Sequence, residues 1–306
     1  MTRAWITLAL CLLLGNFGYA DVVLRGASSG WAGGLAESGL QRLQARLSQG
    51  DLRLALAPVG SDLDQLRALS SGELQIALVR SSALANYYRP WSLLTLPYLF
   101  GEGGAAAWLQ GIEGQRLLLP GEGQPWRCLL YLSMGPRCIA SPQPISNWQG
   151  LRSKTVLVPQ SRFSWEFYKS LGCDPWAGAL EGAQDKGRTQ ATEATLLDLH
   201  QGGWLQGQSY VWQPGHAEEW LVLLIDERVW SKLSGAHRQR LTRSLSEVEL
   251  EMVPQIVIRQ SEARALLGLR FRQDPPEVVQ GQRPRFSELR KRLLRLLDGR
   301  WMDALP

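Results

Sequence analysis

The opening part of the chain alternates short apolar strands with helical segments. Leucine or isoleucine at every second position predicts strands at 52–56 and 74–78, each with one buried face. Apolar residues recur at helical spacing over 36–47, and a second helix is expected over 61–68, where a serine begins the segment as a cap. With a first strand at 22–24, this order predicts a parallel sheet covered by helices.

The second half of the chain continues the same α/β pattern. Strand-like segments lie at 128–132, 155–158 and 220–225, and a helix is expected over 162–171, before a glycine. A long amphipathic helix is predicted over 236–266. Proline inside a helix lacks the N–H donor and clashes with the preceding turn, so we expect a kink at its proline. That proline is Pro254, and the apolar face consists of Leu241, Leu245, Val248, Met252 and Ile256.

The last amphipathic segment, 286–297, has two possible roles. Leu289, Leu293 and Leu296 lie on one helical face, and basic residues surround the other. A basic amphipathic helix can contact an anionic membrane or an acidic partner. We favour the simpler interpretation, in which its apolar face packs against the body of the protein.

The first twenty residues have the pattern of an export signal. Arg3 precedes an apolar run over 4–14, which is too short to span a bilayer as a stable anchor. Gly18 and Ala20 supply the small residues that signal peptidase requires, so residues 1–20 are predicted to be a signal peptide. The mature protein is then expected in the periplasm, beginning at Asp21.

Charge and cysteine content exclude several classes of function. The formal net charge of +5 is modest, and no basic patch is interleaved with aromatic residues, so nucleic acid is not an expected partner. Cysteine and histidine show no metal-site spacing, and no cofactor is expected. An oxidising compartment would permit a disulfide between Cys128 and Cys138, but we favour buried, unpaired thiols for these two and for Cys173.

Several segments in a fixed order carry a family resemblance. The run over 66–79, followed by 84–86 and 94–100, resembles the substrate-binding subunits of TRAP transporters, in the C4-dicarboxylate-binding class. Further agreement extends over 142–151, 158–161, 167–172 and 221–230.

The resemblance implies a periplasmic binding protein fold, with two α/β lobes, a ligand cleft and a long kinked helix spanning both lobes. Lobe I would comprise 21–134 and 221–255, and lobe II would comprise 135–220 and 256–306. A protein of this kind binds a small organic acid or zwitterion and delivers it to the integral membrane subunits of a TRAP transporter. It is not an enzyme, and a monomer is the default expectation.

The expected carboxylate anchor is missing from this sequence. The resemblance implies an arginine in the strand before Pro159, but Leu157 occupies that position. A second family arginine matches Arg137, which becomes the best candidate for ligand binding, and a family loop matches loosely at Gln190 and Thr192. A desolvated carboxylate without its guanidinium loses about 2 to 5 kcal/mol. The ligand is therefore expected to be less acidic, more apolar, or absent.

An absent ligand would fit an alternative role, in which the fold serves as an extracytoplasmic sensory or protein-interaction partner. If a ligand does bind, Trp31 and Trp165 lie where lobe segments would face the cleft and could stack on a ring or hold a cation. Packing in the core or between the lobes is the explanation that we favour for these tryptophans. Ser28 and Ser29 are further hydrogen-bonding candidates.

The segment 26–30 also fits the G-x-S-x-G pattern of a serine nucleophile elbow between a strand and a helix. Such an elbow follows several strands of a sheet, whereas only 21–25 precede this one in the mature chain. A base would have to come from one of three histidines, none of which has a supporting context: His200, His216 and His237. A ligand-binding loop at the carboxyl edge of a sheet explains the same residues better.

Overall fold

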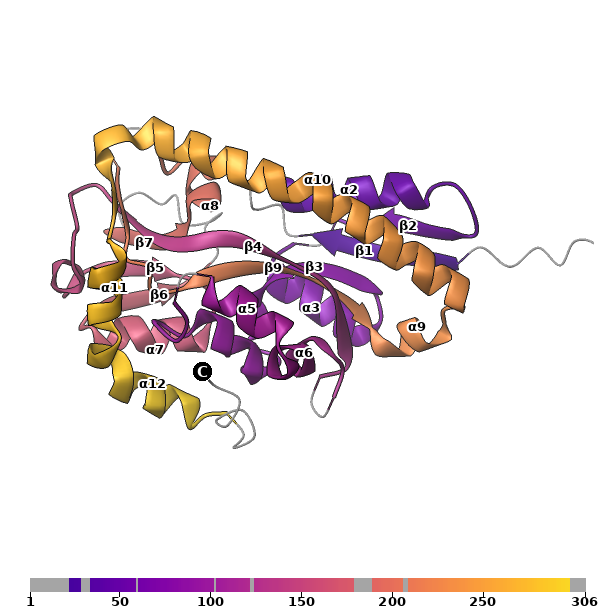
Figure 1. Ribbon diagram of the computed structural model, residues 1–306, viewed down its shortest axis with the longest axis horizontal. Coiled ribbons are helices and arrows are strands. Elements are labelled where there is room, and N and C mark those ends of the chain that lie inside the picture. Colours follow the sequence, from indigo (N-terminus) through magenta and orange to yellow (C-terminus); the bar gives the residue numbers. More distant parts are fainter. Residues whose placement is uncertain are drawn as a thin grey trace, which may run out of the picture.

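The computed structural model describes residues 22–28, 34–58, 60–101, 103–121, 124–178, 189–205 and 209–297. Ten strands form one mixed sheet, and helices cover both of its faces (Figure 1). The strands are β1 Val22–Ser28, β2 Leu52–Leu56, β3 Ile76–Arg80, β4 Trp126–Ser141, β5 Thr155–Val158, β6 Asp174–Ala177, β7 Ala191–Thr195, β8 Tyr210–Gln213, β9 Glu218–Asp226 and β10 Phe271–Gln273.

The helices fall on two sides of the sheet, with α2 and α10 on one side and α3, α5 and α6 on the other (Figure 1). Their bounds are α2 Leu35–Leu47, α3 Asp62–Ser71, α4 Ser81–Leu84, α5 Gly104–Gln110, α6 Ile112–Leu118, α7 Arg162–Ser170, α8 Leu196–Gln201, α9 Glu227–Lys232, α10 Gly235–Leu267, α11 Pro276–Gln282 and α12 Ser287–Leu294. Short 3₁₀ helices span Arg89–Thr95, Trp148–Leu151, Gly268–Arg270 and Pro284–Phe286.

The opening strand and helix pattern is confirmed. Strand β1 pairs in parallel with both β2 and β3. Helix α3 starts at the predicted cap, where the Ser61 hydroxyl accepts from the backbone N–H of Asp64 and the Asp64 carboxylate accepts from the backbone of Ser61. Strand β3 begins two residues later than expected, because Leu74 still closes the end of α3 by donating from its N–H to the carbonyl of Ala68.

The parallel arrangement predicted for the opening strands does not extend to the middle of the sheet. The strand order is β2-β1-β3-β9-β4-β7-β5-β6, and β9 runs antiparallel to both β3 and β4. Strand β4 is also much longer than its predicted core. Its residues 126–136 pair with β9, and residues 137–141 pair with β7 and β8. The two long strands therefore join the halves of the sheet, and the proposed lobe boundary at 134/135 lies beside this change and stays a prediction.

Helix α10 runs unbroken along both halves of the sheet (Figure 1). Pro254 lies inside it on the solvent side, where water can satisfy the carbonyl that proline leaves without a helical donor. The whole predicted apolar face is buried. It meets α2, where Gly39 allows close approach because a Cβ there would lie 2.5 Å from the sulfur of Met252. Arg42 and Arg46 of α2 form ion pairs with Glu251 along the same contact.

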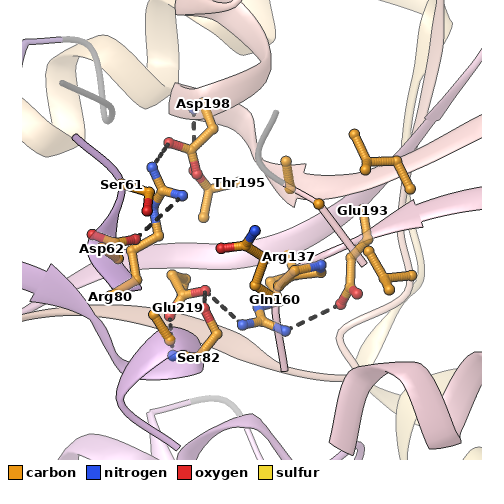
Figure 2. A pocket seen from close by; sticks show the side chains of 16 residues that line it. Ser61, Asp62, Arg80, Ser82, Arg137, Gln160, Glu193, Thr195, Asp198 and Glu219 are labelled. Atoms are coloured by element: carbon orange, nitrogen blue, oxygen red, sulfur yellow. Dashed lines mark hydrogen bonds and ion pairs between the residues drawn. The ribbon is translucent and has the colours of Figure 1, made fainter. Parts of the chain in front are cut away.

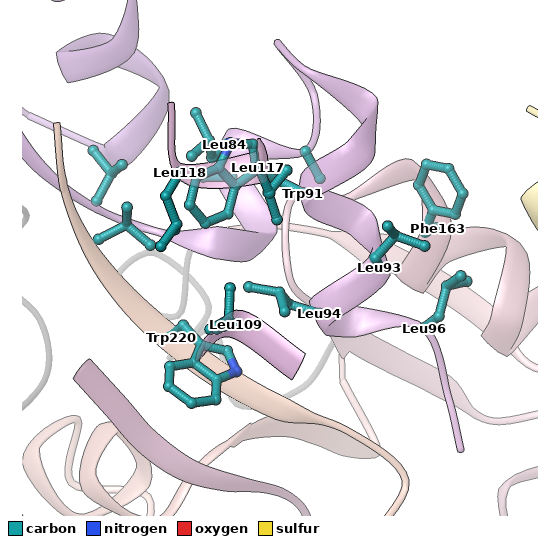
Figure 3. Close-up of a cluster of buried hydrophobic side chains, with 14 of the residues drawn as sticks. Leu84, Trp91, Leu93, Leu94, Leu96, Leu109, Leu117, Leu118, Phe163 and Trp220 are labelled. Atoms are coloured by element: carbon teal, nitrogen blue, oxygen red, sulfur yellow. The ribbon is translucent and has the colours of Figure 1, made fainter. Parts of the chain in front are cut away.

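The largest hydrophobic core lies under α5 and α6, against β3 and β9 (Figure 3). Trp91 is fully buried at its centre, and its indole N–H donates to Oε1 of Gln124 over 2.8 Å. Leu293 and Leu294 of α12 belong to the same cluster. The interpretation of the C-terminal segment as a helix packed on the body is therefore confirmed.

The described residues also test the predictions for the cysteines and for membrane-spanning helices. Cys128, Cys138 and Cys173 are all free thiols, and the preferred interpretation without a disulfide is confirmed. Burial raises the pKa of Cys128 and of Cys138 to about 12. The predicted signal peptide lies outside the described residues. Within the described part of the chain, no helix combines the length and apolar character needed to cross a membrane.

Candidate functional site

A pocket lined by charged side chains lies between the two halves of the sheet (Figure 2). Segments from both halves contribute to it, together with the joining strands β4 and β9. Its cavity volume is about 50 Å³. The charged residues in its lining are Asp62 at the start of α3, Arg80 at the end of β3, Arg137 in β4, Glu193 in β7, Asp198 in α8 and Glu219 in β9.

Arg137 lies at the bottom of this pocket and is almost completely buried. Its Nη2 donates to Oε2 of Glu219 over 2.5 Å, and its Nη1 lies 3.3 Å from Oγ of Ser164 and 3.4 Å from Oε1 of Glu193. Burial alone would raise the pKa of each glutamate, but the charge of Arg137 outweighs it, and both pKa values lie below the ordinary value. Both carboxylates are therefore charged at neutral pH.

The two glutamates are fixed by further hydrogen bonds. Glu219 accepts from the hydroxyl of Ser81 over 2.8 Å and from the hydroxyl of Ser82 over 2.9 Å. Both serines follow β3, so Glu219 connects the first half of the sheet to Arg137. Glu193 contacts Nε2 of His216 over 2.8 Å. The result is a continuous buried polar network across the line where the halves meet.

Arg80 forms the opposite side of the pocket (Figure 2). Its Nη1 lies 3.7 Å from Oδ2 of Asp62, and its Nη2 lies 3.8 Å from Oδ1 of Asp198. Both distances exceed hydrogen-bond length, although Coulomb attraction still acts between the charges. Asp198 is oriented by the hydroxyl of Thr195, which donates to its Oδ2 over 2.9 Å. Arg80 thus lies between an aspartate of each half.

The family described as "Bacterial extracellular solute-binding protein, family 7" matches residues 29–268. The chain belongs to this family. A curated relative, the C4-dicarboxylate-binding protein DctB of Bacillus subtilis (strain 168), is 23% identical over 222 residues, which make up 70% of this chain and 63% of the relative's own length. The predicted resemblance to TRAP solute-binding proteins is confirmed.

Solved structures show the same fold. The sugar acid binding protein DctPAm from Advenella mimigardefordensis, in complex with galactonate, gives a TM-score of 0.80 at 18% identity and covers 93% of this chain and 96% of its own. A TRAP periplasmic solute-binding protein from Shewanella oneidensis with bound succinate gives 0.82 at 15% identity, covering 93% and 98%. The predicted two-lobe binding-protein fold is therefore confirmed.

Membership of solute-binding family 7 also decides between the functional classes. The family is described as one of extracellular solute-binding proteins, which is the class that the sequence predicted. The hypothesis of a serine nucleophile elbow is set aside on this ground, and the alternative sensory role gains no support from these relatives. Among the described residues, no group of three or more His, Cys, Asp or Glu side chains could hold a metal ion.

Two of the residues that the family resemblance singled out line the charged pocket. Arg137 is its buried floor, and Leu157 lines its wall with a buried apolar side chain where the resemblance implies an arginine. Thr192 is buried in β7 behind the wall, and its neighbours Glu193 and Ala194 line the pocket instead.

The remaining site candidates lie elsewhere. Gln190 is exposed, and its Oε1 accepts from the N–H of Thr155, which holds the start of β5. Trp165 lines a separate hollow on α7, where the Lys169 ammonium lies 5.7 Å from its ring centre. Ser28 ends β1 half-buried and is not among the described residues that line the charged pocket. Ser29 and Trp31 lie outside the described residues.

Most of the charged residues of the pocket were missed from the sequence. A usable signal was the charge at the end of an apolar strand, as with Arg80, the last residue of β3. Ligands of open α/β sheets bind near the carboxyl ends of strands. Glu219, near the start of β9, is a second charge beside an apolar run. What no local signal reveals is that these particular ends face one another.

A larger cavity of about 360 Å³ lies on another side of the buried network, where His216 forms part of its wall. Leu94, Leu96 and Phe100 make that wall partly apolar. Its arginine, Arg283, donates to the backbone carbonyls of Tyr98 and Leu99 and so holds this part of the structure together. We take the charged pocket as the solute site because ionised side chains of both halves converge only there among the described cavities.

The buried glutamates predict how stability depends on pH. Because the folded pKa values of Glu193 and Glu219 lie below 4.5, their contribution is fully present above that value and is lost as the pH falls through the folded values. Urea unfolding should give a constant midpoint from neutral pH down to about pH 5 and a falling one below it. The fall should be smaller in Glu193→Gln. Stability that increases on acidification would contradict the described network.

Proposed function

We propose that this protein is the solute-binding component of a TRAP-type transporter and that it binds a small organic acid or zwitterion in the pocket between Arg80 and Arg137. The observation that carries the proposal is the convergence of ionised side chains from both halves of the sheet on one cavity. Charged groups are rarely buried unless they are paired or bind a ligand. The relatives with bound succinate and galactonate support a small polar solute.

Binding requires movement of the two lobes. A cavity of about 50 Å³ has room for about three to five water molecules, which is too little for an organic solute. The solute therefore enters a more open form, contacts both lobes and shifts the population toward a closed form. The closed form is the state that the membrane subunits would recognise.

The proposed roles of the residues follow their positions. Arg80 contacts the solute from lobe I, and Arg137 forms the floor on the lobe II side. Ser28 is retained as a candidate because it ends β1 at the carboxyl edge of the sheet, and Ser29 and Trp31 are retained from the sequence alone. Trp165 is a candidate only for the outer rim, and Gln190 and Thr192 support the second half of the sheet.

The proposal extends to location and partners. The protein acts outside the cytoplasmic membrane, in the periplasm, after removal of a signal peptide over 1–20. It acts as a monomer, delivering its solute to the integral membrane subunits of the transporter. Family membership and the export pattern of the first residues support this proposal.

A thermal-shift screen tests solute binding directly. At one hundred times its dissociation constant, a solute that binds only the folded state adds about 2.7 kcal/mol of stability. For a chain of this size the melting temperature should rise by about 5 to 10 °C. The panel comprises small organic acids, zwitterions and sugars, with sodium chloride of equal ionic strength as the control. Folded protein that responds to none of them would overturn the proposed function.

A further inference from the structure

The lining of the charged pocket carries an excess of negative charge. The described residues of this lining include four carboxylates and two guanidinium groups, which together give a net charge of −2 when all are ionised. A protonated His216, which contacts Glu193 but does not line the pocket, would still leave the site negative. The carboxylates are those of Asp62, Glu193, Asp198 and Glu219, each less than a tenth exposed.

Arg137 already donates to two carboxylates of the protein. Both of its terminal nitrogens are engaged, Nη2 by Glu219 and Nη1 by Glu193 and Ser164. Only its buried Nε has no hydrogen-bond partner among the described residues. A solute carboxylate would have to share this guanidinium with Glu193 and Glu219, whereas a strong bidentate clamp has two parallel N–H donors that serve a single carboxylate. Arg137 therefore neutralises the protein's own carboxylates before any solute arrives.

The remaining cation, Arg80, lies between two carboxylates of the protein. Asp62 and Asp198 lie 3.7 and 3.8 Å from its guanidinium, so this side of the pocket presents charges of both signs. An oxygen anion of the solute would bind Arg80, and a cationic nitrogen beside it would bind the two aspartates. A site with both signs of charge side by side complements a solute with both signs of charge.

A solute with two carboxylates fits this pocket poorly. At the position of Leu157 the wall is apolar, so no second guanidinium faces the solute from β5. Bringing two further negative charges next to four buried carboxylates costs Coulomb energy that Arg80, which already lies beside two aspartates, does not offset. The pocket thus disfavours the class of solute that the resemblance to dicarboxylate-binding proteins implies.

We propose that the solute of this protein is a small zwitterion, with an ammonium or other cationic nitrogen between Asp62 and Asp198 and a carboxylate on Arg80. This inference rests on the proposed solute-binding function and narrows its substrate class. It assigns the two aspartates as the specificity-determining residues and Arg137 to structural neutralisation.

Calorimetry with solutes of matched length and different charge tests the proposal. Succinate, 4-aminobutanoate and butane-1,4-diamine share a four-carbon chain and carry two negative charges, one of each sign, and two positive charges. A set of α-amino acids and betaines adds zwitterions with other distances between the cationic nitrogen and the carboxylate. At least one zwitterion should bind, about tenfold or more tighter than any dicarboxylate or sugar acid of similar size.

The outcomes separate this inference from the proposed function. If succinate or a sugar acid binds as tightly as the best zwitterion, or tighter, the inference is overturned while solute binding stands. If only diamines bind, the role of Arg80 is overturned. If no compound of the panel binds, both the inference and the proposed function are overturned.

Substitutions locate the cationic group of the solute. Asp198→Asn and Asp62→Asn should each weaken the best zwitterion about tenfold or more, because each removes one partner of the nitrogen. In either variant, the ratio of zwitterion affinity to succinate affinity should also be smaller than in the parent protein. Asp174→Asn removes an exposed carboxylate on β6, away from the pocket, and should leave affinity unchanged. Unchanged zwitterion affinity in both pocket variants, with melting temperatures near that of the parent, would contradict the proposal.

Discussion

Replacing Arg137 by alanine is expected to destabilise the protein by about 3 to 5 kcal/mol, because it leaves Glu193 and Glu219 buried without their counter-ion. Both carboxylates are almost completely buried, so water cannot take over the role of the arginine. Urea unfolding at neutral pH, with the slope of the transition compared between variants, measures the change. A loss far below this range would show that the buried network does not hold the halves of the sheet together.

The effect of Arg137→Ala should depend on pH in a diagnostic way. Without the guanidinium, burial raises the pKa of Glu193 and Glu219, so both can be neutralised by mild acid in the variant. The difference in free energy of unfolding between the parent protein and Arg137→Ala should therefore become smaller as the pH falls toward 4.5. Arg137→Lys keeps the positive charge but loses the planar guanidinium, so its stability should lie between those of the parent protein and Arg137→Ala. Arg116→Ala, which breaks an exposed pair with Glu113, is the control and should change stability little.

Replacing Trp91 by alanine should lower the free energy of unfolding by about 3 to 5 kcal/mol. Its side chain is fully buried at the centre of the largest core cluster (Figure 3), where the surrounding leucines cannot collapse into the space of an indole. Gln124 would also lose the N–H that donates to its Oε1. Thermal and urea unfolding of the variant measure the loss.

The variant Trp91→Phe separates packing from hydrogen bonding. Phenylalanine keeps an aromatic ring but not the indole N–H, so it should recover part of the stability. Gln124→Leu removes the other partner; however, its amide also donates to the carbonyl of Leu117, so a loss is expected there too. If Trp91→Ala melted close to the parent protein, the side chain would not be part of a close-packed core.

The sequence by itself determined the local elements and the family. Alternation at 52–56 places β2, helical spacing and the Ser61 cap place α3, and the apolar face of 236–266 places α10 within one residue at each end. These elements depend on neighbouring residues, so their signals are local. The order of segments that resembles TRAP solute-binding proteins then fixed the two-lobe fold and the solute-binding role. Leu157 already indicated that the usual anchor for an acid is missing.

Only the tertiary structure decided the middle of the sheet and the electrostatics of the pocket. The alternation of apolar residues along a strand does not show whether the strand pairs in a parallel or an antiparallel direction. The antiparallel placement of β9 between β3 and β4 therefore could not be predicted from the sequence pattern. Arg137 could be selected by resemblance, but its engagement by Glu193 and Glu219 joins residues 56 and 82 positions away. Coulomb energy depends on distance in space and on burial, neither of which sequence separation gives. Folding therefore decided that the selected arginine is paired with two glutamates of the protein and that Arg80 lines the same pocket.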